Sequence, residues 1–388
     1  MSKILMFSNR LIIGGPSVHL LSLVEHFCND HEILLLYGAP LDDELSMEQE
    51  FRKFDIQMYQ IANMKRSLNP IPDIFIMAEI KKLLKEFSPD IIHTHTYKPG
   101  IIGRYLAKRH NVKRIIHTYH GLIFDSYFSS ALSKVLVHID TYLAKSTDVI
   151  IALSEIQKQQ ILDKIGNSIE NKIQIIPLSI SQDKFRYSKE DGLLFRNNIG
   201  VSEDRILLAM VGRVADVKNI AKTIDVFSEL KKDANTNNST LVIVGDGDQK
   251  NSLIAQARAL SLKVDLEKGD ENSDIIFVSW QREIQPLYSA IDILVLSSKN
   301  EGTPLNIIEA QLMKTAILAP RVGGIPDIVV EGKTALLFDN RQEMFAKMHE
   351  LISNRTLIGN LQQNALKFAK ERFSISKMLE SYNKLYNI

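Results

Sequence analysis

The chain has 388 residues, of which 45% are hydrophobic and 24% are charged, an ordinary composition for a globular protein of about two domains. Residues 1–180 hold 20 basic and 19 acidic side chains and the remainder holds 27 of each, so the net charge of +1 argues against a nucleic-acid-binding protein. Cys28 is the single cysteine, and the sequence has neither a signal-peptide pattern nor the roughly 20 consecutive apolar residues of a membrane span, so we expect a cytoplasmic chain without disulfides.

The first half alternates short apolar runs with amphipathic stretches, which predicts strands joined by helices. Apolar strands that are followed by helices are typical of a parallel sheet covered on both faces. The expected strands are Ile4–Phe7, Ile33–Tyr37, Ile56–Ile61, Ile91–Thr94, Ile115–Thr118, Val149–Leu153 and Ile173–Pro177, and the expected helices include Phe75–Phe87, Ile101–Arg109 and Leu132–Ala144.

The same pattern restarts after a polar stretch over residues 180–204, which we interpret as a linker. The prediction is therefore an α/β protein of two doubly wound, Rossmann-like domains that face a central crevice, with ligands at the carboxyl ends of the strands. The expected strands are Ile206–Val211, Leu241–Val244, Ile275–Val278, Ile293–Leu296, Ala316–Ala319 and Ala335–Phe338, and the expected helices are Ile220–Lys232, Met344–Leu351, Leu357–Glu371 and Ser374–Tyr386.

Two glutamates near the C-terminus point to a ligand site. Glu301 follows an apolar strand in a Gly/Pro loop, and Glu309 lies inside the helix that we expect to begin near Pro304. The N-terminus of a helix favours phosphate, whereas carboxylates accept hydrogen bonds from vicinal hydroxyls. The loop therefore predicts a ligand that carries both phosphate and sugar.

Two cations lie in the loop after the Ile206 strand. Arg213 follows Gly212, and Lys218 comes just before the next helix. Arginine clamps a diphosphate with two donors, and lysine adds a mobile point charge. An ordinary solvated loop is the alternative, but the Glu301 loop at a second strand end of the same sheet favours a diphosphate site.

Gly14 and Gly15 follow the first strand and open a helix, a pattern that lets the backbone approach a phosphate or a sugar closely. A tight turn without a ligand is the alternative. The spacing does not match the dinucleotide-binding motif.

Nine of the ten histidines lie at or before His138, and four of them form pairs at two strand ends. Such pairs can bind a metal, but no acidic ligand is close in the sequence, so we expect no metal ligands here. We expect His93 and His117 to be structural. His120, beside Gly121, is the best candidate for a bond to a substrate hydroxyl.

Two further features have simple alternatives. Asp246 and Asp248 could hold a divalent metal on a diphosphate, but we favour a turn in which Asp248 caps the next helix. Trp280 could flank a nucleobase or lie in the core, and the sequence does not separate these alternatives.

Together these residues resemble the family 4 retaining glycosyltransferases, which include many bacterial capsule, O-antigen and exopolysaccharide transferases. The resemblance covers nearly the whole chain and implies the GT-B fold. It implies an acceptor-side domain at 1–180, a nucleotide-sugar-binding domain at 181–373, and a final helix at 374–388 that packs back on the first domain. The motifs that carry it are Gly14-Gly15, Tyr119-His120-Gly121, Gly212-Arg213 with Lys218, and Glu301 with Glu309, followed by Gly323-Gly324-Ile325-Pro326-Asp327.

The resemblance also implies roles for these positions. Arg213 and Lys218 would bind the donor diphosphate, Glu309 the ribose hydroxyls, and Glu301 the donor sugar. His120 would contact that sugar near the reacting carbon. The other residues expected to touch substrate are Gly14, Gly15, Gly212, Trp280, Arg282, Gly302, Thr303, Pro304 and Leu305.

The expected function is transfer of a sugar, with retained configuration, from a nucleotide-diphosphate sugar such as a UDP-sugar to a glycan or lipid-linked precursor of a bacterial surface polysaccharide. Fixed cations would stabilise the leaving diphosphate, so we expect neither a metal nor a cofactor. A nucleotide-sugar 2-epimerase of the same fold and a non-enzymatic sugar-binding protein are the alternatives. The basic set of Arg104, Lys108, Arg109, Lys113 and Arg114 could meet anionic lipid at the inner face of the membrane, although a solvated surface explains it equally well.

Overall fold

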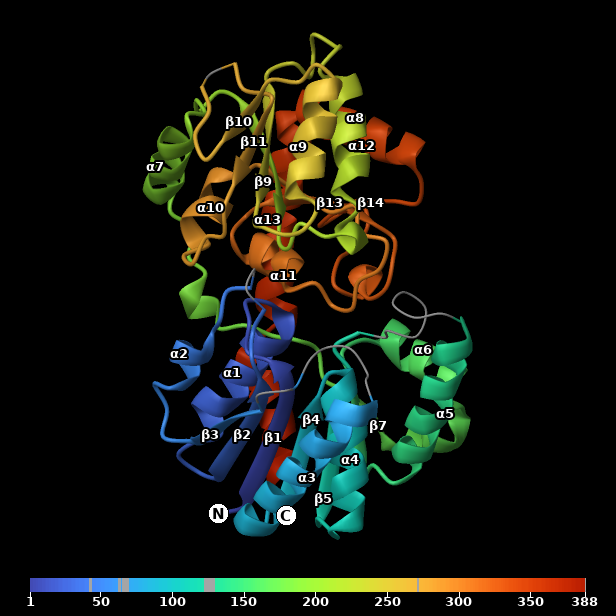
Figure 1. Ribbon diagram of the computed structural model, residues 1–388. Helices are drawn as coiled ribbons and strands as arrows, with labels where there is room; N and C mark the ends of the chain where they lie inside the picture. Colours follow the sequence, from blue (N-terminus) through green and yellow to red (C-terminus); the bar gives the residue numbers. More distant parts are fainter. Residues whose placement is uncertain (42–43, 62–63, 65–69, 122–129, 271, 388) are drawn as a thin grey trace. The chain divides into compact units, whose positions relative to one another are not determined.

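The computed structural model describes residues 1–41, 44–61, 64, 70–121, 130–270 and 272–387, and the chain forms two compact units. Unit 1 comprises Met1–Ile180 and Ile375–Ile388, and unit 2 comprises Ser181–Ser374. In the described residues each unit has a parallel sheet of seven strands with helices packed on it (Figure 1). The α/β prediction is confirmed.

The sheet of unit 1 has the strand order β3-β2-β1-β4-β5-β6-β7. Its central strand β1 places Leu5 beside Leu34 on one side and beside Ile92 on the other. The strands are β1 (Lys3–Arg10), β2 (Glu32–Gly38), β3 (Gln57–Ile61), β4 (Ile91–His95), β5 (Arg114–Thr118), β6 (Val149–Ala152) and β7 (Ile173–Ile175), and the helices are α1 (Gly15–Phe27), α2 (Glu48–Phe51), α3 (Pro70–Phe87), α4 (Tyr97–Arg109), α5 (Ser130–Lys145), α6 (Glu155–Ile165) and the 3₁₀ helix η1 (Asn167–Lys172).

The last helix, α14 (Ile375–Tyr386), belongs to unit 1 and is the red helix among the blue and cyan elements of Figure 1. Ser2 Oγ donates to the carbonyl oxygen of Tyr386 at 3.4 Å, and Arg114 Nη1 donates to that of Leu385 at 2.9 Å. The two ends of the chain therefore meet in one unit.

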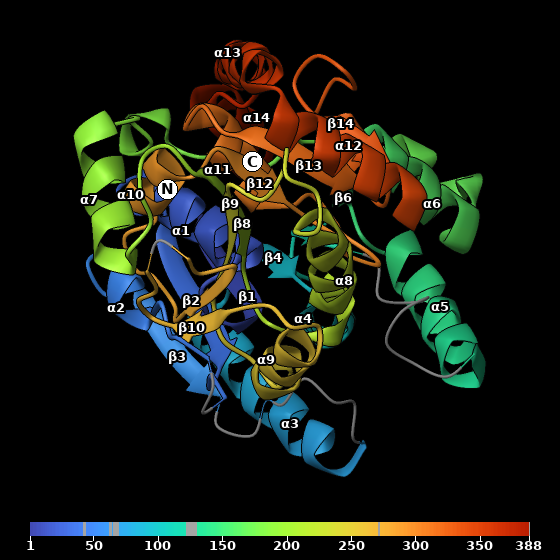
Figure 2. The ribbon, with the colours of Figure 1, turned by 90° about the horizontal axis from the view of Figure 1, so that it is seen from above.

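The sheet of unit 2 has the order β10-β11-β9-β8-β12-β13-β14. Helices α8 and α9 lie side by side, as Figures 1 and 2 both show. The strands are β8 (Ile206–Val211), β9 (Ser239–Val244), β10 (Val264–Leu266), β11 (Ile275–Val278), β12 (Ile293–Val295), β13 (Ala316–Pro320) and β14 (Leu336–Phe338), and the helices are α7 (Lys189–Ile199), α8 (Ile220–Leu230), α9 (Lys250–Ala259), α10 (Gln285–Ala290), α11 (Leu305–Leu312), α12 (Arg341–Ser353) and α13 (Arg355–Arg372), with 3₁₀ helices η2 (Gln182–Lys184), η3 (Asp216–Lys218) and η4 (Ile325–Asp327).

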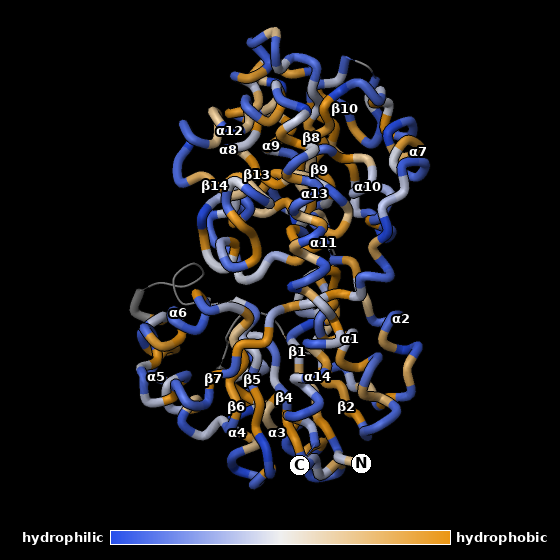
Figure 3. The backbone as a smooth tube through the Cα atoms, turned by 180° about the vertical axis from the view of Figure 1, so that it is seen from behind, coloured by the Kyte–Doolittle hydropathy of each residue, from blue (hydrophilic) through white to orange (hydrophobic). Residues whose placement is uncertain are grey.

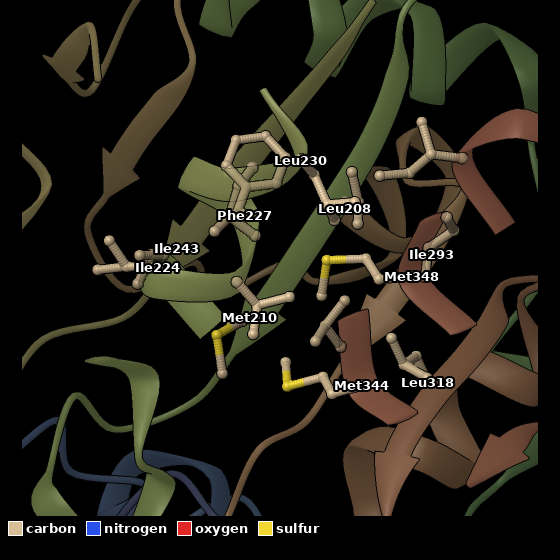
Figure 4. Packing of buried hydrophobic residues seen from close by; sticks show 14 of the residues in the cluster. Leu208, Met210, Ile224, Phe227, Leu230, Ile243, Ile293, Leu318, Met344 and Met348 are labelled. Atoms are coloured by element: carbon tan, nitrogen blue, oxygen red, sulfur yellow. The ribbon is translucent and has the colours of Figure 1, made fainter. Parts of the chain in front are cut away.

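The cores of both units are built from apolar strands, and Figure 3 shows the hydrophobic residues gathered along them. In unit 2, Leu208 and Met210 of β8 pack in one buried cluster with Phe227 of α8 and with Met344 and Met348 of α12 (Figure 4). All five side chains are buried, so this cluster fixes the strand ends from which the site residues emerge.

The polar stretch over residues 180–204, interpreted as an irregular linker, does begin where unit 2 begins, but its middle forms the helix α7 (Lys189–Ile199). Ser188 caps this helix by accepting a hydrogen bond from Asp191 N at 3.1 Å, and Gly200 ends it in the left-handed conformation. Arg196 then ties the helix to the sheet through Asp292 Oδ2 at 2.7 Å and the carbonyl oxygen of Ala290 at 2.8 Å. The capping signals were present in the sequence, but the polar composition obscured them.

Candidate functional site

The loop between β12 and α11 holds Glu301, and α11 begins at Leu305, directly after Pro304, as expected. Lys218 Nζ lies 2.6 Å from Glu301 Oε1, and Ser298 Oγ donates to the same oxygen at 2.7 Å. The fold therefore brings together two residues that are far apart in the sequence, at the ends of the neighbouring strands β8 and β12.

Polar contacts hold these two loops in register. Ser297 Oγ donates to the carbonyl oxygens of Lys218 and Asn219, at 3.0 and 2.9 Å, and Lys299 N donates to that of Val217 at 2.9 Å. The position of the Lys218 ammonium is thus set by the backbone on both sides.

The turn at Gly323 and Gly324, after β13, supports the Glu301 loop. Gly324 N donates to the carbonyl oxygen of Gly302 at 2.9 Å. A Cβ on Gly323 would lie 1.7 Å from the carbonyl oxygen of Glu301, and the residue has φ +54°. Only glycine fits this position, which explains Gly323 in the turn after β13.

The side chain of Arg213 differs from that of Lys218 in its contacts within the described residues. It is half-buried, and no acceptor for its guanidinium lies among the residues that the structure describes. Its neighbour Gly212 closely approaches Gly245, where a Cβ would lie 2.1 Å from the carbonyl oxygen of Gly212. The loop therefore presents backbone and an uncompensated cation, the combination that an anion requires.

Glu309 is the fifth of the eight residues of α11 and is buried. It accepts a hydrogen bond from Tyr288 OH at 2.8 Å. Burial raises the pKa of Glu309 to about 7, while the Tyr288 bond acts in the opposite direction. This carboxylate can gain further stabilisation from hydroxyl donors, because Tyr288 engages only one of its oxygens.

Two more polar atoms near the start of α11 have no hydrogen-bond partner in the described parts of the chain. They are Thr303 Oγ1 and Asn306 Oδ1, both buried. Asn306 Nδ2 donates to the carbonyl oxygen of Val211 at 3.0 Å, which joins α11 to the end of β8. Pro304 and Leu305 are also buried, so they shape the site but expose little surface.

The two residues expected on the nucleobase side, Trp280 and Arg282, are held by fewer side-chain hydrogen bonds in the described parts of the chain than the glutamates. Trp280 is half-buried and its Nε1 has no acceptor among the described residues, while Arg282 is exposed. Asp246 forms the expected turn and pairs with Lys250 Nζ at 3.2 Å. The helix cap predicted for Asp248 is wrong, because α9 begins after Gln249 without a side-chain cap.

In unit 1, Gly14 and Gly15 begin α1 as predicted, and both are half-buried. The loop before them is fixed by Ile12 N, which donates to Ser17 Oγ at 3.1 Å, and by Ile13 N, which donates to the carbonyl oxygen of Leu45 at 3.0 Å. A ligand that reached this loop would meet a rigid backbone.

Two of the histidines are structural, as expected. His93 is buried and contacts Tyr386 OH at 2.6 Å and Thr118 Oγ1 at 2.8 Å. His117 is also buried, and its Nδ1 lies 2.8 Å from Thr94 Oγ1. These bonds tie β4 to β5 and His93 to α14.

His120 lies just beyond β5 and is half-buried. Its Nε2 is 3.1 Å from His95 Nδ1. Burial lowers the pKa of His120 to about 3, so the ring is neutral near neutral pH and can act as one donor and one acceptor.

The basic set was considered either as a lipid-facing or as a solvated surface, and two of its members are engaged inside unit 1. Arg104 is buried in an ion pair with Asp140, which also accepts a bond from Tyr119 OH at 2.7 Å. Arg114 is directed to the carbonyl oxygen of Leu385. No helix in the described residues is long and apolar enough to cross a membrane.

The sequence did not identify Tyr288, Ser298 or Asn306, which hold the predicted residues in place. Tyr288 lies in the short helix α10, where nothing in the local pattern marks a partner for Glu309. Ser298 directly precedes the Glu301 loop, and this proximity is the signal that could have identified it.

Comparison with known proteins agrees with this arrangement. Residues 194–372 match the family described as Glycosyl transferases group 1, and residues 13–184 match Glycosyltransferase Family 4. The chain is 26% identical over 362 residues to the UDP-Gal:alpha-D-GlcNAc-diphosphoundecaprenol alpha-1,3-galactosyltransferase of Escherichia coli, covering 92% of this chain and 88% of that protein.

Two further similarities extend over most of the chain. The capsular polysaccharide biosynthesis glycosyltransferase CapM of Staphylococcus aureus is 24% identical, with 87% of each chain covered. The structure of Anabaena Alr3699/HepE in complex with UDP-glucose superposes with a TM-score of 0.83 at 18% identity, covering 99% of both chains.

Proposed function

This chain belongs to the group 1 glycosyltransferases and has their GT-B fold, and we propose that it transfers a sugar from a UDP-sugar to a hydroxyl of a glycan or lipid-linked acceptor. Unit 2 is the donor-binding half in this proposal, and unit 1 is the acceptor-side half. The similarity to transferases of capsule and diphosphoundecaprenol-linked glycans supports a role in bacterial surface polysaccharide synthesis.

The observation that carries the proposal is the Lys218–Glu301 pair, 2.6 Å apart, in the same sheet edge as the partnerless Arg213. Without a ligand, Glu301 neutralises Lys218. A donor diphosphate would take over Lys218 and Arg213, and Glu301 would become available to accept hydrogen bonds from the donor sugar. The two members of the pair would thus contact different parts of the donor, Lys218 the diphosphate and Glu301 the sugar.

The nucleoside end fits Glu309. Its carboxylate is fixed by Tyr288, and its remaining oxygen can accept from the vicinal hydroxyls of a ribose. The start of α11, with Gly302, Thr303, Pro304 and Leu305, adds backbone donors and the positive end of a helix for the distal phosphate. Trp280, Arg282 and Gly212 are proposed to complete the nucleotide side.

The leaving group in this reaction is a nucleoside diphosphate. Its growing negative charge is best stabilised by groups already in position, and Arg213, Lys218 and the α11 N-terminus are such groups. We propose that they act without a divalent metal and that no cofactor is needed.

A retaining outcome by double displacement would require a carboxylate nucleophile. In the proposed donor complex Glu301 accepts hydrogen bonds from the hydroxyls of the donor sugar, and Glu309 is hydrogen-bonded to Tyr288 and assigned to the ribose, so neither carboxylate is assigned as the nucleophile. We therefore propose attack of the acceptor on the same face from which the diphosphate leaves, assisted by that phosphate. His120, Gly14 and Gly15 are the proposed contacts contributed by unit 1.

The proposal is tested by incubating the protein with a panel of UDP-sugars in the presence of EDTA and measuring UDP release. We expect slow hydrolysis of one or a few donors, and a strong reduction in the Glu301→Ala variant. Glu350→Ala, at an exposed site on α12, is the matched control and should behave as the wild type. UDP release that requires an added metal would contradict the metal-independent mechanism, and a change of the donor sugar without release would indicate an epimerase.

A further inference from the structure

Three histidines from separate elements of unit 1 meet at one point. They are His19 from α1, His95 at the end of β4 and His120 after β5. Their ring centroids lie 5.8 Å (His19–His95), 5.3 Å (His19–His120) and 5.4 Å (His95–His120) apart. One ring nitrogen from each lies within 4.8 Å of the other two.

The hydrogen bonds within this triad leave most of its ring nitrogens unused. His19 is 1% exposed, and neither of its nitrogens has a hydrogen-bond partner among the described residues. His95 Nε2 and His120 Nδ1 are also buried without a described partner. His19 alone has both nitrogens unsatisfied, which costs about 1–3 kcal/mol for each lost bond, so His19 calls for a ligand.

The spacing of the ring nitrogens is also compatible with a metal ion. Two nitrogens bound to one tetrahedral zinc at about 2.1 Å lie roughly 3.4 Å apart. His95 Nδ1 and His120 Nε2 are 3.1 Å apart, and the third nitrogen is within reach of a small side-chain movement.

The charge state is also suitable. Burial and the neighbouring histidines lower the pKa values of His19 and His95 well below the ordinary value, and burial lowers that of His120. Neutral imidazole nitrogen is the form that binds metals. Three imidazoles favour zinc, cobalt, nickel or copper over magnesium or calcium, which prefer oxygen ligands.

We infer that His19, His95 and His120 form a binding site for one divalent transition-metal ion of the zinc class. The half-exposed His120 gives the ion a way in and leaves a coordination position for water. From the sequence we expected no metal ligands, because no acidic ligand lies close to the strand-end histidine pairs. His19 completes the set from a helix that precedes them.

The site has a consequence that depends on the proposed function. His120 is the residue proposed to contact the sugar, and a bound ion would take one of its nitrogens. Zinc is therefore expected to slow UDP release by the wild type, and to slow it much less in a variant that has lost the site. Zinc that binds without slowing the reaction would count against the role of His120 and would leave the metal site intact.

The site itself is tested without substrate. The metal-free wild type, His19→Phe and His26→Phe are titrated with zinc chloride by calorimetry, and with cobalt(II) by visible absorption. Phenylalanine keeps an aromatic ring beside Tyr382, which packs 5.4 Å from His19. His26 is an exposed histidine of the same helix and controls for surface binding.

We expect one ion per wild-type chain, tetrahedral cobalt bands, affinity lowered about tenfold or more in His19→Phe, and no change in His26→Phe. Zinc should also raise the melting temperature of the wild type but not that of His19→Phe. If His19→Phe fails to fold, His120→Ala replaces it and should show the same loss. Absence of stoichiometric binding to the wild type, or equal affinity in the site variants, would overturn the inference.

Discussion

At the scale of single residues, we expect Lys218 and Glu301 to have opposite effects on the binding of a donor diphosphate. Glu301 competes with a diphosphate for Lys218 in the free protein, so Glu301→Ala should bind UDP at least as tightly as the wild type while its transfer rate falls. UDP affinity by calorimetry and UDP-sugar turnover on the same preparation provide the check. Loss of UDP affinity together with turnover would show that Glu301 positions the nucleotide instead.

The raised pKa of Glu309 predicts that UDP binding at the proposed donor site depends on pH. A carboxyl with a folded pKa above its unfolded value binds protons preferentially in the folded state, so its burial reduces stability as pH rises from 4.5 to about 7. That loss is at most about 3 kcal/mol. Above pH 7 the ionised form prevails and is available to ribose hydroxyls.

The wild type should therefore gain UDP affinity over Glu309→Gln as pH rises through about 7. Comparing the two proteins at each pH cancels the titration of UDP itself. Glu350→Gln, which is exposed, should follow the wild type throughout. An affinity ratio that does not change with pH would mean that Glu309 does not meet the nucleotide in its ionised form.

Residue chemistry was the part of the site that the sequence predicted best. The spacing of Glu301 and Glu309 identified a loop and a helix, and Gly212-Arg213 identified a second strand end. The sequence could not predict that Lys218 bonds to Glu301, because that contact depends on the adjacency of β8 and β12. Tyr288 and His19 were missed for the same reason.

At the scale of elements, the Glu301 loop depends on the turn after β13. Gly323→Ala would force a Cβ against the carbonyl oxygen of Glu301 at a positive φ, so it should lower the melting temperature and weaken UDP binding. Gly359→Ala, within α13, meets no atom within 4 Å and should be neutral or stabilising by up to about 1 kcal/mol. Calorimetric melting of both variants separates the two effects, and equal behaviour would contradict the steric account.

Most elements could be predicted because apolar runs of strand length recur between amphipathic segments. The elements that the sequence analysis missed lie where the contrast between apolar and amphipathic segments is weak. β10 has the short sequence Val264–Leu266 with partly exposed residues, and α7 is polar on most of its surface. Both elements depend on packing against other parts of the fold for their stability. The hydrophobic periodicity of a segment does not report on such tertiary contacts.

At the scale of the whole molecule, α14 joins the end of the chain to unit 1. Tyr382 and Tyr386 are fully buried there, and Tyr386 OH bonds to His93. Removing residues 375–388 should destabilise unit 1 by several kcal/mol through lost burial, while unit 2 should remain folded. Hydrogen exchange should then rise in residues 1–121 and stay unchanged in residues 206–372. Unchanged exchange in unit 1 would contradict this assignment.

A milder variant tests the same connection. Tyr386→Phe keeps the ring but leaves His93 Nδ1 buried without its partner, which should cost about 1–3 kcal/mol. Tyr142→Phe, at an exposed tyrosine of α5, is the matched control. Equal melting temperatures for the two variants would show that the His93 bond adds little to stability.

The central claim is that unit 2 binds a nucleoside diphosphate through Arg213 and Lys218, and UDP binding by calorimetry in EDTA tests it most directly. The wild type should bind UDP. Arg213→Met and Lys218→Met should each lose about 1.5–3 kcal/mol, roughly ten- to hundredfold. Lys299→Met removes a neighbouring cation that already pairs with Asp216 and should bind as the wild type does. No binding by the wild type, or equal losses in all three variants, would contradict the account.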